Sequence, residues 1–193
     1  MRHTGLAAAF AAFLTMTHGA AALQEPAAGG DEALRHFHTS VNRYAALHRR
    51  LEGPLPPRVP DRDTFSTLLA RRYLASAIRT ARTSARQGDI FDPGAARVFR
   101  AIIAEAYSAP GGAALADDFR RRTVRPVPDA VINELYPMEV AALVPDPILQ
   151  RLPALAEDVE YRAVNADLIL WDIHAEIVVD VLPRAFLLNS GTW

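Results

Sequence analysis

The chain of 193 residues contains no cysteine and no lysine. Without cysteine it forms no disulfide, has no thiol nucleophile and offers no thiolate ligands for a zinc ribbon or an iron–sulfur cluster. Without lysine it lacks Schiff-base chemistry and a lysine base, because all 21 basic side chains are arginine. These absences exclude several large enzyme classes and leave packing as the source of stability.

Recognisable catalytic motifs are also missing. The sequence has no nucleophile-elbow serine, no H-E-x-x-H pair and no glycine-rich phosphate loop. His174 and Glu176 form a His-x-Glu fragment of the kind found in zinc deaminases, but the cysteines that those enzymes need are absent. The sequence therefore predicts no cofactor, and it favours a non-catalytic domain over an enzyme.

The start of the chain has the pattern of a cleavable export signal. Residues 1–22 combine a basic start, an apolar run and small side chains at Ala20 and Ala22. The apolar run is about half the roughly twenty residues that a membrane-spanning helix needs, so we expect cleavage near Ala22 rather than an anchor. The prediction is a periplasmic or secreted protein with no transmembrane anchor after signal cleavage. An alanine-rich first helix of a cytosolic protein is the alternative.

The remaining residues are predicted to form a flexible lead at 23–30 and a single α+β domain at 31–193. Apolar residues at spacings of three and four predict an N-terminal bundle of three to four helices over 31–125. Frequent prolines predict an irregular, proline-rich crossover over 126–158, with one brief helical turn near Ile148.

Short β-branched and aliphatic runs over 159–183 predict a C-terminal three-stranded antiparallel β-meander, followed by a tail at 184–193. The alternation of the third run places Ile177, Val179 and Val181 on one face. Such a small sheet needs a covering layer, so we expect it to be packed on the helices.

Charge is unevenly distributed along the chain. Residues 31–125 hold 17 arginines against 10 acids, whereas residues 126–193 hold 3 against 11. A second predicted helix, which runs from about Asp63 or Thr64 to Arg86, carries an arginine stripe made of Arg71, Arg72, Arg79, Arg82 and Arg86. The stripe is interpreted as a solvated helix face or as a surface for an anionic envelope component. The net charge of −1 argues against nucleic acid as a partner.

Three histidines of the first predicted helix are candidate metal ligands, because imidazole binds nickel, copper and zinc. They are His36, His38 and His48, and His174 near the end of the chain is a fourth histidine available for a metal site. No two of them have the spacing of four residues that lets one helix chelate an ion. Ordinary surface or interfacial histidines are the alternative interpretation.

A polar turn between the last two predicted strands is the candidate catalytic group. Asp172, His174 and Glu176 place an imidazole between two carboxylates, an arrangement that could orient a general base. Hairpin turns are also polar for structural reasons, because an aspartate can bond its own backbone and a glutamate stays solvated.

Three stretches carry a resemblance to a family of bacterial exported proteins of unassigned function. They are residues 44–57, 85–91 and 152–183. The resemblance implies export and a shared fold but no activity, and the chain departs from the family pattern at Ala154, Ala156 and Asn165. The C-terminal hairpin is also similar to that of small periplasmic proteins linked to nickel and cobalt homeostasis.

The sequence as a whole leaves three functional hypotheses: a non-catalytic binding or envelope-associated domain, a hydrolase-like enzyme at the polar turn, and a metal-handling protein.

Overall fold

The computed structural model describes residues 25–54, 64–123 and 127–187, which form five helices and four strands. In chain order these are α1 (Glu25–Glu52), α2 (Thr64–Ala81), α3 (Pro93–Ser108), α4 (Gly112–Arg122), β1 (Ala142–Leu143), α5 (Asp146–Leu149), β2 (Val159–Val164), β3 (Asp167–Asp172) and β4 (Ile177–Leu182). The α+β class is confirmed, with five helices in place of three to four and four strands in place of three. The expected signal and the end of the tail lie outside the described residues.

The helices form where apolar spacing and end signals agree. On α1, Phe37, Val41 and Tyr44 are buried on one face, as their spacing predicts. At the start of α3, the Asp92 carboxylate accepts the backbone N–H of Ala95 at 2.8 Å, while Pro93 occupies the first turn. Both of these signals for the start of α3 could be recognised in the sequence.

Two helix boundaries differ from the expectation. The lead expected at residues 23–30 is helical from Glu25 onward, because its alanines favour the helix despite two glycines. Helix α2 ends at Ala81 rather than near Arg86. The chain leaves the helix there because the Asp180 carboxylate on β4 accepts the backbone N–H groups of Gly88, Ile90 and Phe91. No local pattern in the sequence signals such a long-range contact.

The four strands form one antiparallel sheet in the order β1-β2-β3-β4. The three predicted strands are present, and the short β1 adds to β2 from within the crossover. A bulge interrupts the pairing of β3 with β4, so that Leu170 lies opposite Asp180 whereas Trp171 lies opposite Val178. The bulge shifts the alternation of β4 and turns Val181 to the face opposite Ile177 and Val179. The expectation that these three residues share one face was therefore wrong for Val181.

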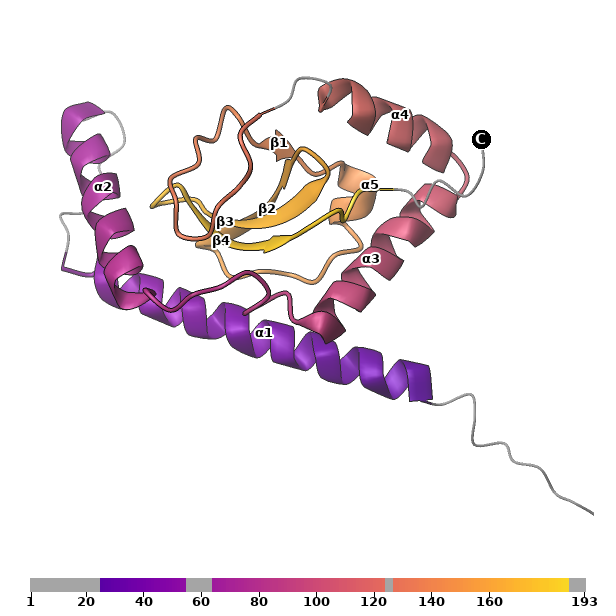
Figure 1. Cartoon of the computed structure of the whole chain (residues 1–193), viewed down its shortest axis with the longest axis horizontal. Coiled ribbons are helices and arrows are strands. Elements are labelled where there is room, and N and C mark those ends of the chain that lie inside the picture. The colour runs from indigo at the N-terminus through magenta and orange to yellow at the C-terminus, as the bar shows by residue number, and fades with distance from the viewer. Residues whose placement is uncertain (1–24, 55–63, 124–126, 188–193) are drawn as a thin grey trace, which may run out of the picture.

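The sheet is covered on both faces. One face packs on α1, α3 and α5, as expected, and its core includes Phe37, Phe99 and Ile177 (Figure 1). The other face is covered by the crossover, whose Tyr136 packs on Trp171 and accepts the indole N–H at its carbonyl, 2.8 Å away. Every residue of β4 is buried as a result.

The same crossover also pairs with the outer edge of β4. The backbone N–H of Asn133 donates to the carbonyl of Val178 at 2.8 Å, and that of Tyr136 donates to the carbonyl of Glu176 at 2.8 Å. In return, the N–H of Val178 donates to the carbonyl of Glu134 at 3.0 Å. A single bridge between Leu135 and Ile177 marks this contact.

Candidate metal centre

A cluster of polar side chains lies where the C-terminal half of α1 meets the strand ends. Helix α1 supplies Tyr44, His48 and Glu52, which are spaced by four residues and therefore lie on one face. Two other parts of the chain face this helix. One is Asp158, just before β2, and the other is the end of β3 with the turn that follows it. Three segments that are far apart in the chain thus meet at one place.

Asp172, the last residue of β3, organises this cluster. Its Oδ1 accepts the backbone N–H groups of His174 at 2.9 Å and Ala175 at 2.7 Å, which builds the β3–β4 turn. Its Oδ2 lies 2.6 Å from both the hydroxyl of Tyr44 and Nδ1 of His48. Because a carboxylate that is surrounded by donors acts only as an acceptor, Nδ1 of His48 must carry a proton.

The other nitrogen of His48 faces two further carboxylates. Nε2 lies 3.0 Å from Oε2 of Glu52 and 3.7 Å from Oδ1 of Asp158. The imidazole is fully buried, so a charge on it would be stabilised mainly by these acids. Its direction is fixed, because Asp172 holds Nδ1 and aims Nε2 at Glu52 and Asp158.

His174 approaches the same group from the β3–β4 turn. Its Nδ1 lies 2.9 Å from Oε1 of Glu52, yet this buried nitrogen makes no aligned hydrogen bond with any residue that the structure describes. The rings of His174 and His48 are 5.2 Å apart, centroid to centroid. A buried imidazole nitrogen this close to a carboxylate oxygen has a position that a metal ligand could occupy.

The charges of the cluster shift the pKa values of its members. Burial alone would lower the pKa of His48, but the hydrogen bond to Asp172 and the charges of Asp172 and Asp158 raise it above its ordinary value. Burial alone would raise the pKa of Asp172, but the hydrogen bond and charge of His48 lower it. For Glu52, the effect of burial is likewise overcome by His174 and His48, and the pKa is lowered. Burial and the Asp172 charge raise the pKa of Tyr44 well above its ordinary value, so the phenol keeps its proton.

Four of these residues have the composition and spacing of a metal centre. One ligand atom from each of His48, Glu52, Asp158 and His174 lies within 4.8 Å of all the others. Two imidazole nitrogens and two carboxylate oxygens suit a divalent transition metal such as zinc. The side chains of Glu52 and His174 are 29% and 28% exposed, whereas Asp158 is 12% exposed and His48 is fully buried. The cluster is therefore partly open to solvent at Glu52 and His174.

The structure separates the three histidines that the sequence groups together. His36 is exposed and lies 3.9 Å from Glu32, and His38 packs edge-on against Phe37. With a rise of 1.5 Å per residue, His38 lies about 15 Å along α1 from His48. Of these three histidines, only His48 belongs to the cluster, where it meets the fourth candidate, His174.

The residues of the polar turn also contact different partners. Asp172 bonds the backbone of its own turn and the ring of His48, rather than the ring of His174. Glu176 pairs with Arg71, whose Nη1 lies 2.6 Å from its carboxylate. The predicted carboxylate–histidine–carboxylate group is thus not assembled, but His174 belongs to the cluster around His48 and Asp172 supports it.

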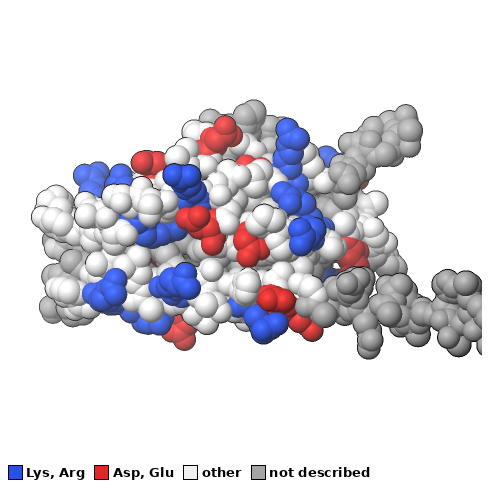
Figure 2. All heavy atoms as spheres, turned by 60° about the horizontal axis from the view of Figure 1, so that its bottom comes forward, with Lys and Arg blue, Asp and Glu red and all other residues white. Residues whose placement is uncertain are grey.

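Members of the arginine stripe have separate surroundings. Arg79 approaches Glu134 at 3.6 Å, and Arg82 donates to the side chain of Asn133 and the carbonyl of Val179. Arg72 and Arg86 are exposed. On the face that Figure 2 shows, arginines and acids are interspersed rather than gathered by sign.

No helix among the described ranges is long and apolar enough to cross a membrane.

Sequence reasoning missed three members of the cluster. Glu52 stands four residues after His48 on α1, a spacing that a search for mixed histidine–carboxylate pairs would find. Tyr44 has the appearance of an ordinary core residue, and Asp158 lies in an acidic run that the sequence assigns to solvent.

Comparison of the chain with protein families, curated proteins and solved structures finds no match, so the geometry of the cluster is the basis for a functional assignment.

Proposed function

We propose that this protein binds one divalent transition-metal ion at the cluster of His48, Glu52, Asp158 and His174. The observation that carries the proposal is the convergence of four ligand atoms from three chain segments within 4.8 Å. Nε2 would be the ligand atom of His48 and Nδ1 that of His174. Zinc is the first ion to test, because it combines readily with nitrogen and carboxylate oxygen in four-coordinate sites.

The spacing of the ligand atoms supports this choice. Metal–ligand bonds of about 2.0–2.2 Å place neighbouring ligands of a tetrahedral ion about 3.3–3.6 Å apart. The distances from Nε2 of His48 to the oxygens of Glu52 and Asp158, 3.0 and 3.7 Å, lie on either side of that range. The ligand atoms that lie farther apart, up to 4.8 Å, would have to come closer for all four to bind one ion. Calcium and magnesium fit less well, because they prefer oxygen ligands alone.

Asp172 has the role of a positioning residue in this proposal. A metal-bound histidine usually donates its second N–H to a carboxylate, which fixes the ring and makes it a better ligand. The contact of 2.6 Å between Asp172 and Nδ1 of His48 has this form. Tyr44 holds the carboxylate from the opposite side through its hydroxyl.

The partial exposure of Glu52 and His174 favours an exchangeable ion over a sealed structural one. Together with the export signal expected at residues 1–22, this supports a non-catalytic, metal-binding protein of the cell envelope or its surroundings. The hydrolase hypothesis is less well supported, because Asp172, His174 and Glu176 contact different partners.

Metal uptake by the purified protein tests the proposal. After treatment with a chelator, the protein is dialysed against zinc, nickel, cobalt or copper, and the bound metal is measured. We expect one equivalent of zinc, with loss of uptake in His48→Ala and in His174→Ala. The double variant His36→Ala/His38→Ala is the matched control, because it removes two histidines of α1 that lie outside the cluster. Absence of uptake, or loss of uptake in the control alone, would overturn the proposal.

A further inference from the structure

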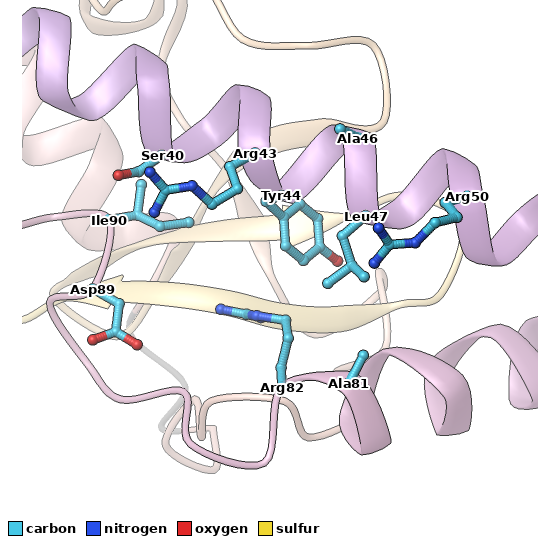
Figure 3. Close-up of a pocket in the computed structure, with 10 residues that line it drawn as sticks. All are labelled: Ser40, Arg43, Tyr44, Ala46, Leu47, Arg50, Ala81, Arg82, Asp89 and Ile90. Atoms are coloured by element: carbon cyan, nitrogen blue, oxygen red, sulfur yellow. The ribbon is translucent and has the colours of Figure 1, made fainter.

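A hollow of about 450 Å³ lies between α1 and the end of α2 with the segment that follows it, on a part of the surface that the metal ligands do not line (Figure 3). Arg43 and Arg50 reach into it from α1, and Arg82 faces them from just after α2. The ring of Tyr44 forms part of its wall. Its volume is within the range of about 300–1,000 Å³ that is common for small-molecule sites.

The charges that line the hollow are mainly positive. Three guanidinium groups are accompanied by one carboxylate, that of Asp89. This carboxylate already accepts the backbone N–H of Arg86 at 2.8 Å. The hollow therefore presents an excess of positive charge to any ligand that enters it.

Two of these guanidinium groups form no hydrogen bond or ion pair within the part of the chain that the structure describes. Among the described residues, Arg43 and Arg50 have no hydrogen-bond or ion-pair partner, although Arg71 and Arg79 on α2 each face a glutamate. They stand seven residues apart on α1, two turns of helix, and so lie on the same face. Their forked N–H donors are free to bind an anion with two parallel hydrogen bonds.

The third guanidinium is held in place. Arg82 donates to the side-chain oxygen of Asn133 at 2.8 Å and to the carbonyl of Val179 at 2.9 Å. Its Cζ lies 4.9 Å from the centre of the Tyr44 ring. Arg82 is thus a fixed positive charge, whereas Arg43 and Arg50 are adjustable ones.

Apolar side chains complete the lining. Leu47 lies between the two arginines of α1, and Ile90 lies at the end of the hollow near Asp89 (Figure 3). A bare inorganic ion would leave this apolar surface uncovered. The geometry points to a binding site for a small organic anion, a phosphate or a carboxylate, whose charged group is held by the arginines of the hollow and whose apolar part packs on Leu47 and Ile90.

Calorimetric titration of the purified full chain with phenyl phosphate and with benzoate tests this site. We expect saturable binding of one molecule of at least one of these probes, weakened by added salt. Benzyl alcohol, which has the ring without the charge, should bind at least tenfold more weakly. A preference for one anionic probe identifies the charged group as phosphate or carboxylate.

The double variant Arg43→Ala/Arg50→Ala should weaken binding at least tenfold. Its matched control is Arg35→Ala, which removes an exposed arginine of the same helix outside the hollow. Both arginines of the double variant are exposed, so folding should be unaffected, and circular dichroism checks this. Lack of saturable binding of both anionic probes, equal binding of benzyl alcohol, or an equal loss in Arg35→Ala would overturn the assignment.

Discussion

His48 and Asp172 are 124 residues apart in the chain, yet Nδ1 of the imidazole lies 2.6 Å from Oδ2 of the carboxylate, and both side chains are fully buried. This contact joins α1 to the end of β3. It also decides which nitrogen of His48 is directed toward Glu52 and Asp158. The properties of the cluster should therefore depend on Asp172 even though Asp172 is not itself a proposed ligand.

Replacement of Asp172 by asparagine should weaken zinc binding about 10–100-fold, the usual effect of losing a carboxylate behind a metal-bound histidine. Titration against a chromogenic chelator measures the affinity. Asp167→Asn is the control, because Asp167 begins the same strand and its carboxylate likewise accepts a backbone N–H, that of Arg184. Equal zinc affinity in the wild type and Asp172→Asn would contradict the role of Asp172 as a positioning residue.

Zinc should stabilise the folded protein, because the proposed ligands come from three segments that separate on unfolding. At a free zinc concentration 100 times the dissociation constant, the free energy of unfolding should rise by about 2.7 kcal/mol. Urea unfolding with and without zinc measures the difference. His174→Ala should abolish the gain while leaving the metal-free protein folded, since His174 is partly exposed. A gain that persists in this variant would place the ion elsewhere.

The metal-free protein should have a stability maximum in mildly acidic solution. The raised pKa of His48 contributes stability that is fully present below about pH 6.5, the ordinary histidine value, and is lost as the pH rises through the raised value. The lowered pKa values of Asp172 and Glu52 contribute stability that is present above about pH 4 and is lost as the pH falls through them. Together these shifts place the maximum between about pH 4.5 and 6.5.

Urea unfolding in the presence of a chelator, repeated across this pH range, measures the profile. His48→Gln should remove the part of the decline above pH 6.5 that belongs to the imidazole. An identical alkaline decline in the wild type and His48→Gln would show that other groups cause it.

Asp180→Asn should destabilise the protein by about 2–4 kcal/mol, because the new amide group places its own N–H donors against buried donors. The carboxylate of Asp180 accepts the backbone N–H groups of Gly88, Ile90, Phe91 and Val181 at 2.7–2.8 Å. Asp146→Asn, at an exposed position, should change stability by no more than about 0.5 kcal/mol. Chemical denaturation compares the two variants, and equal stability would contradict the anchoring role of Asp180.

Local signals in the sequence predicted much of the fold. The Asp92-Pro93 start of α3 and the three β-branched runs of the sheet are encoded by neighbouring residues, so they could be recognised without the structure. The bulge at Leu170 and Trp171 and the early end of α2 depend on contacts between distant segments. Periodicity contains no information on such contacts.

The candidate site was predicted in fragments. His48 was assigned to a histidine set and Asp172 and His174 to a polar turn, because the sequence places them in different elements. What joins them is the packing of α1 against the strand ends, which no short motif encodes. The one local signal of the cluster is the spacing of four residues between His48 and Glu52.

The pairing of Asn133 and Tyr136 with β4 has a consequence for the behaviour of the protein at high concentration. An open strand edge is a template onto which a second molecule can add its own strand. Here residues 133–136 occupy the first part of that edge, and the opposite edge of the sheet is the two-residue β1. A chain without disulfides would gain protection from strand-to-strand aggregation in this way, before any ligand is bound.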